Sequence, residues 1–141
     1  MKTTVRFIES LLSLYMAIAL TISVSGCARS EPNQFPDSEN VYHVYPGESI
    51  QSALNAAAKN DSANRVLVHA GIYQPTEPSQ ALIFFNSAHD GITLEADGKV
   101  ILTAANPNLA DRSKASYPAV VNHVVYFGDG ISRKTIFRGF H

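Results

Sequence analysis

The stretch PGESIQSALNAAAK at residues 46–59, followed by RVLVHAGIY at residues 65–73, decides the fold expected of this chain. Ser49 is a suitable N-cap, and Asn60 and Asp61 end the segment. Between them, apolar residues recur at helical spacing on one face. They are Ile50, Ala53, Leu54 and Ala57. The sequence therefore predicts one α-helix over residues 49–59.

Short strands are expected on both sides of this helix. Residues 41–45 read as one strand, and after the helix apolar, often β-branched segments alternate with turns rich in Gly, Asn and Asp. These segments are 65–69, 81–85, 91–96, 100–103, 120–121, 124–127 and 135–137. The pattern indicates an all-β fold. Because Asn-Gly hairpin turns between alternating strands are missing, it favours a solenoid over a sandwich or barrel, with the helix covering the first rung.

Residues 46–54 and 66–73 together resemble the N-terminal signature of pectin-lyase-like parallel β-helix proteins. Segments 92–102 and 138–140 resemble the next coils, so the resemblance covers nearly all of residues 41–141. It implies a right-handed parallel β-helix (solenoid) with N-terminal coils only, apparently truncated after His141. The superfamily includes polysaccharide lyases, pectinesterases, phage tailspikes and non-enzymatic periplasmic proteins, so the resemblance does not select a reaction. Calcium is a possible cofactor only in a full-length, lyase-like form.

In the expected coils, three pairs of residues should occupy equivalent inward positions: Val66 and Val68, Ile92 and Leu94, and Thr135 and Phe137. This register places three residues one above another, just past the inward positions: His69, Glu95 and Arg138. In polysaccharide lyases a cation neutralises a uronate carboxylate while a base removes the α-proton. The alternative is an ion-pair ladder in solvent at the strand ends. No catalytic residue can be assigned by position.

The segment from Asn106 to Pro118 reads as a long side loop, and such loops on a rigid scaffold often carry function. Arg112, Lys114 and Tyr117 are its candidate contacts to an acidic sugar. The alternative is that they are ordinary surface residues.

The composition of the chain limits the classes of ligand that are expected to bind it. The net charge is −1, from 11 basic and 12 acidic residues, and no basic stripe with interleaved aromatics suggests nucleic acid. The five histidines have no H-x-x-x-H spacing, so no metal site is predicted.

The N-terminus predicts export and lipid anchoring. Lys2 and Arg6 precede an apolar run too short to span a bilayer, as in a signal peptide. The run ends in VSGC at residues 24–27, which resembles the lipobox of bacterial lipoproteins. The resemblance implies a signal peptide at 1–26, acylation (palmitate and related chains) of Cys27, and outer-membrane sorting. Residues 27–40 are expected to be the lipidated cysteine and a flexible tether. The alternative is a transmembrane anchor or an ordinary secretory signal.

Two functions remain open at this point. One is a glycan-directed envelope lipoprotein that binds polysaccharide, or the N-terminal part of a polysaccharide-lyase-like protein. The other is a non-catalytic envelope or surface scaffold that presents loops to a partner. The sequence does not decide whether the chain is an enzyme.

Overall fold

The computed structural model describes residues 36–37, 39–61 and 64–141. The predicted signal peptide at residues 1–26 and the predicted acylation site, Cys27, lie outside the described residues. The elements in chain order are β1 (Val41–Val44), α1 (Ile50–Ala57), β2 (Arg65–Tyr73), β3 (Ser79–Phe85), the 3-10 helix η1 (Ser87–His89), β4 (Thr93–Leu102), β5 (Val121–Phe127) and β6 (Ile136–Phe140).

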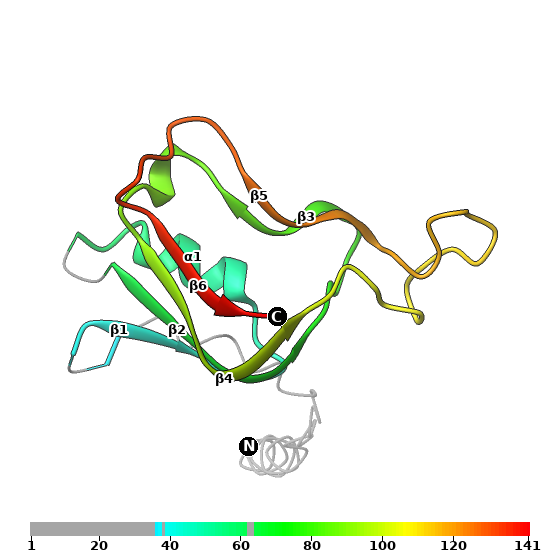
Figure 1. Ribbon diagram of the computed structural model, residues 1–141, viewed down its shortest axis with the longest axis horizontal. Helices are drawn as coiled ribbons and strands as arrows, with labels where there is room; N and C mark the ends of the chain where they lie inside the picture. The colour runs from blue at the N-terminus through cyan, green and yellow to red at the C-terminus, as the bar shows by residue number, and fades with distance from the viewer. Residues whose placement is uncertain (1–35, 38, 62–63) are drawn as a thin grey trace, which may run out of the picture.

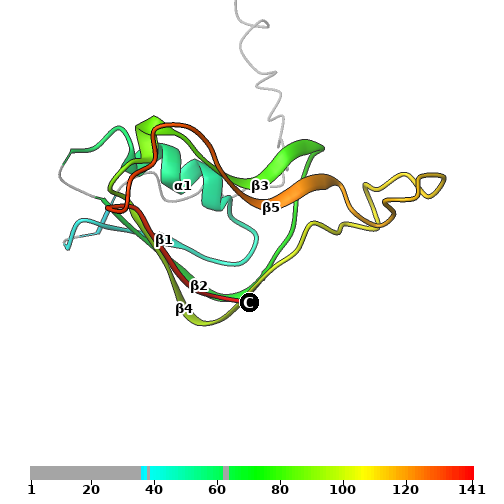
Figure 2. The same cartoon turned by 45° about the horizontal axis from the view of Figure 1, so that its top comes forward.

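The described residues form six strands in two small parallel sheets (Figure 1). The larger has the order β1-β2-β4-β6, and the smaller pairs β3 with β5. Parallel neighbours need a crossover, because the chain must return to the same end of the sheet before the next strand begins. Here α1 crosses between β1 and β2, β3 between β2 and β4, and β5 between β4 and β6. Figure 2 shows α1, β3 and β5 on the side of the molecule opposite β1, β2 and β4.

The predicted right-handed parallel β-helix was wrong. The described residues show two small parallel sheets, of four and two strands, together with one α-helix. The sequence pattern marks where short strands and turns lie, but it does not specify how strands are divided among sheets. Residues 103–120, between β4 and β5, contain only an isolated antiparallel bridge from Ala105 to Ala119. The β3–β5 pair therefore remains a two-stranded sheet.

The core lies between the two sheets and is lined by alternate residues of each strand. Val66 pairs with Leu94, and Leu94 with Phe137, so one column of side chains runs across the large sheet. Val66 and Leu94 are fully buried. The predicted equivalence of Val66 with Ile92 was wrong, because Val66 pairs with Leu94, two residues further along the chain. A shift of two leaves the inward face unchanged, because the side-chain period of a strand is two.

Helix α1 closes one side of this core. Its N-cap Ser49 accepts a hydrogen bond from the Ser52 backbone N–H at 3.2 Å. The helix buries Ile50, Ala53, Leu54 and Ala57. The Gln51 side chain accepts from the Phe84 N–H at 2.7 Å and donates to the Phe84 carbonyl at 3.1 Å. Because both polar groups of one strand residue are satisfied by one side chain, Gln51 attaches α1 to β3.

A buried histidine connects η1 to the same helix. His89 Nδ1 accepts from the Asn86 N–H at 3.1 Å, so Nε2 carries the ring proton and donates to Asn55 Oδ1 at 3.0 Å. His89 is only 4% exposed. Burial lowers the pKa of His89 from its ordinary value of 6.5. The folded chain therefore holds this imidazole neutral.

We expect His89 to make the fold sensitive to acid. The unfolded chain binds a proton at His89 as pH falls through 6.5, while the folded chain resists it until lower pH. The contribution of a neutral His89 is therefore present above pH 6.5 and is lost as pH falls below it. Urea unfolding at pH 7.5 and 5.5 should show a smaller pH-dependent loss in His89→Gln than in wild type. His123→Gln, at an exposed position of β5, should behave as wild type. Equal losses in all three chains would contradict the assignment.

Candidate ligand-binding face

The candidate site is the outward face of the four-stranded sheet. Along β2, Val66 and Val68 point into the core, so Arg65, Leu67 and His69 lie on the opposite face. Residues of β4 and β6 that pair with β2 extend this face across the sheet. At roughly 3.3 Å per residue, Arg65 and His69 are about 13 Å apart along the strand.

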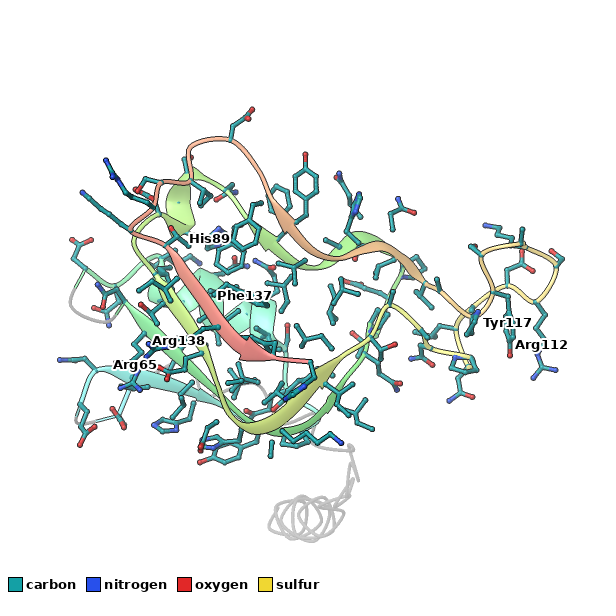
Figure 3. The ribbon with its side chains drawn as sticks, viewed as in Figure 1. Arg65, His89, Arg112, Tyr117, Phe137 and Arg138 are labelled. Carbon is teal, nitrogen blue, oxygen red and sulfur yellow. The ribbon has the colours of Figure 1, made fainter. Side chains whose placement is uncertain are left out.

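Arg65 and Arg138 lie close together at the end of the face where β2 begins (Figure 3). The Glu95 carboxylate contacts both, with Oε2 3.1 Å from Arg65 Nη2 and 2.9 Å from Arg138 Nη2. The hydrogen bond from Arg138, then that from Arg65, lowers the pKa of the Glu95 carboxyl against the opposing effect of desolvation. We call these residues the arginine cluster. Its net charge is +1, and the side chains of Arg65 and Arg138 are 45% and 60% exposed.

A carboxylate held by two guanidinium groups is a poor general base, because both stabilise its ionised form. Glu95 is therefore suited to positioning the two arginines rather than to removing a proton from a substrate. The arginines keep further N–H donors, since each guanidinium has five and each contacts Glu95 through a single nitrogen. An anion arriving from solvent could take these donors.

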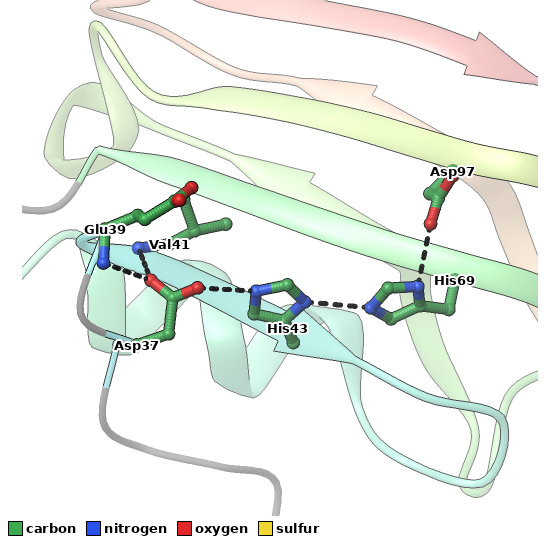
Figure 4. A network of polar contacts seen from close by, with 6 residues as sticks. All are labelled: Asp37, Glu39, Val41, His43, His69 and Asp97. Carbon is green, nitrogen blue, oxygen red and sulfur yellow. Dashed lines mark hydrogen bonds and ion pairs between the residues drawn. The ribbon is translucent and has the colours of Figure 1, made fainter.

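Four side chains form a line of polar contacts at the other end of the face (Figure 4). His43 Nε2 lies 3.0 Å from Asp37 Oδ2, and His69 Nδ1 lies 3.0 Å from Asp97 Oδ2. The two rings meet through His43 Nδ1 and His69 Nε2, which are 2.8 Å apart. Asp37 is itself fixed, because its Oδ1 accepts from the N–H groups of Glu39 and Val41. Asp37 belongs to residues 27–40, which were expected to form the lipidated cysteine and a flexible tether. It nevertheless contacts the sheet through His43.

A tyrosine completes a cluster of flat rings beside this line. The Tyr45 ring lies parallel to that of His69 at a centroid distance of 4.4 Å, and 6.4 Å from that of His43. Tyr45 is 51% exposed, so one face of the cluster is open to solvent. We call Tyr45, His69 and His43 the ring cluster. It adjoins the arginine cluster, because Asp97, the partner of His69, is two residues from Glu95 on β4.

The predicted column of His69, Glu95 and Arg138 is only partly assembled. Glu95 pairs with Arg138, but its β2 partner is Leu67, and His69 pairs with Asp97. The two-residue error in the β2 register accounts for the displaced histidine.

The predicted loop contacts lie elsewhere. Arg112, Lys114 and Tyr117 belong to the exposed loop between β4 and β5. Figure 3 places Arg112 and Tyr117 at the opposite end of the molecule from Arg65 and Arg138. The structure therefore does not combine the two sets of candidate residues into one site.

A second feature is an open groove of about 870 Å³ between α1 and residues 72–84. The charged side chains that line it are both carboxylates, Glu48 and Glu77. It is therefore a poor site for an acidic ligand, and the sheet face is the better candidate.

Sequence reasoning missed five members of the face: Asp37, His43, Tyr45, Arg65 and Asp97. The alternation of residues 65–69 could have placed Arg65 with His69 on one face. Nothing in the spacing of His43 and His69, 26 residues apart, could have shown that their rings meet.

In the part of the chain that the structure describes, no three His, Cys, Asp or Glu side chains are grouped to hold a metal ion. Within the same residues, no helix is both long and apolar enough to span a membrane. No protein-family model, curated protein or solved structure matches this chain.

Proposed function

We propose that this chain is a lipid-anchored envelope protein that binds an acidic polysaccharide on the outward face of its four-stranded sheet. The observation that carries the proposal is the adjacency of the ring cluster and the arginine cluster on one exposed face. A flat, half-exposed aromatic ring offers an apolar surface for the C–H groups of a sugar. Guanidinium groups beside it recognise a carboxylate or sulfate in a planar, two-point manner.

The charge of the arginine cluster supports an acidic ligand at that end of the face. The arginine cluster keeps one positive charge after Glu95 is counted, and both guanidinium groups reach solvent. The distance of about 13 Å along β2 suits a short stretch of polymer, with one unit on the rings and an acidic group at the arginines.

The proposal is for binding without catalysis. The carboxylate nearest the arginines, Glu95, is held ionised by both of them. Asp97 and Asp37 are each engaged by an imidazole. The face thus supplies recognition groups, with its carboxylates already occupied by cationic or N–H partners.

Binding should depend on both clusters. Titration calorimetry of the full chain with an oligouronate should give saturable binding that Tyr45→Ala and Arg138→Gln each weaken about tenfold or more, the loss of roughly one stacked ring or one charge-assisted pair. Binding should also fall with added salt.

The matched control is Arg112→Gln, which removes the same charge from the exposed loop. It should leave the oligouronate affinity unchanged. An equal loss in Arg112→Gln and Arg138→Gln would show that only net charge matters. Absence of binding in wild type would remove the glycan proposal and favour a scaffold that presents its loops to a partner.

The anchor has its own test. We expect wild-type chain expressed in a Gram-negative host to incorporate labelled palmitate and to fractionate with the outer membrane, because acyl chains bury many methylenes at about 0.8 kcal/mol each. Cys27→Ser should lose the label completely and leave the membrane fraction. Ser25→Ala, which keeps a small residue before the cysteine, is the control. A labelled Cys27→Ser chain would contradict acylation at this residue.

A further inference from the structure

The contact between His43 and His69 requires a cation. Each outer ring nitrogen faces a carboxylate oxygen of Asp37 or Asp97, and an ionised carboxylate only accepts hydrogen bonds. Each outer nitrogen therefore carries the ring proton. Two neutral rings would then direct two lone pairs at each other across the 2.8 Å between Nδ1 and Nε2. A cation that lies between the two nitrogens removes that repulsion.

We propose that His43 and His69 form a binding site for a divalent transition-metal ion of the zinc class. Neutral imidazole nitrogen is a preferred ligand of such ions. In known metal sites the second nitrogen of a ligating histidine is commonly hydrogen-bonded to a carboxylate, which fixes the tautomer and raises the basicity of the ligand. Here both histidines have that partner, Asp37 for one and Asp97 for the other (Figure 4).

The rings need to move little to bind the ion. Zinc–nitrogen bonds of about 2.0–2.1 Å at a tetrahedral angle place two ligand nitrogens about 3.3 Å apart, so the present gap opens by about 0.5 Å and the rings tilt. The two rings have space for this movement, because His43 lies on β1, an edge strand of the sheet. The side chains of His43 and His69 are 25% and 23% exposed. The Tyr45 ring supports His69 from one side.

The site has two protein ligands and open positions. No third His, Cys, Asp or Glu joins the pair among the residues that the structure describes. Water or oxygen atoms of a bound molecule would supply the two remaining ligands of a tetrahedral ion, one more than in a zinc site with three protein ligands. The inference does not depend on the proposed glycan function, since it is tested with the metal alone.

The test is calorimetric titration of the full chain with zinc chloride, in a Cys27→Ser background so that no free thiol competes. We expect one zinc ion per chain, and a loss of affinity of about tenfold or more in His43→Gln and in His69→Gln. His123→Gln removes an exposed histidine from the other sheet and should bind as the parent does. Calcium, which prefers oxygen ligands, should not compete.

A second measurement keeps the proposal testable if a variant fails to fold. Nitrogen-15 spectra of the parent chain should show zinc shifting the ring signals of His43 and His69 and leaving that of His89 unchanged. Absence of one-to-one binding would overturn the proposal. Full affinity in both His43→Gln and His69→Gln, or zinc shifts confined to other histidines, would overturn it as well.

Discussion

Phe85→Ala should lower the free energy of unfolding by about 3–5 kcal/mol, the usual cost of removing a buried phenylalanine ring. Phe85 is fully buried at the end of β3. Its ring stacks on Phe127 at 4.7 Å and meets the edges of His89 and Phe137 at 6.0 Å and 6.5 Å. It thus joins both sheets and η1, and no neighbour on one element can fill the space that it leaves. Urea unfolding followed by circular dichroism measures the loss.

Phe127→Ala is the matched control. Phe127 belongs to the same ring stack but is 48% exposed, so its truncation removes less buried surface and leaves no closed cavity. We expect a loss of about 1–1.5 kcal/mol, well below that of Phe85→Ala. Similar losses in the two variants would show that Phe85 does not connect the sheets as described.

Gly130→Ala should cost about 2–4 kcal/mol, from a strained backbone and a steric clash together. Gly130 has a φ of +84°, in the left-handed region that L-residues disfavour. A Cβ atom there would lie 2.6 Å from Ser87 Cβ and 3.1 Å from Ser87 Cα. Neither contact can be relieved by rotating a flexible side chain, so the turn before β6 or η1 must move.

Gly91→Ala separates the two contributions. Gly91 has nearly the same φ, +83°, but a Cβ atom added to it would meet no other atom within 4 Å. Its alanine variant should therefore show only the cost of backbone strain, about 1–2 kcal/mol. Thermal unfolding of both variants gives the comparison. A Gly91→Ala loss equal to that of Gly130→Ala would show that the approach of Ser87 is not significant.

The sequence predicted local structure better than architecture. Ser49 and the apolar spacing after it specify a helix because they are properties of a single segment. Alternation likewise specifies that Val66 and Val68 face inward. The division of the strands into two sheets depends on which strands the crossover segments bring side by side. The turn residues do not specify that pairing. The resemblance of residues 46–73 to a β-helix signature therefore led to the wrong architecture.

The candidate binding face was predicted only in part, because it also depends on how distant strands pair. Glu95 and Arg138 were expected together and lie together. His69 was misplaced because a register between strands is a long-range property, and Val66 pairs with Leu94 rather than with the expected Ile92. His43 lies on β1 and Tyr45 directly follows that strand, whose neighbour in the sheet is set only by the fold. The sequence could not show that their rings would stack with that of His69.

The most direct test of the proposed function is a nitrogen-15 amide spectrum of the full chain titrated with an oligouronate. The account predicts shifts that saturate and are confined to the outward sheet face, at His43, Tyr45, Arg65, His69 and Arg138, with the loop at residues 106–118 unchanged. Shifts confined to that loop or to the groove beside α1, or no saturable shift at any concentration, would contradict it.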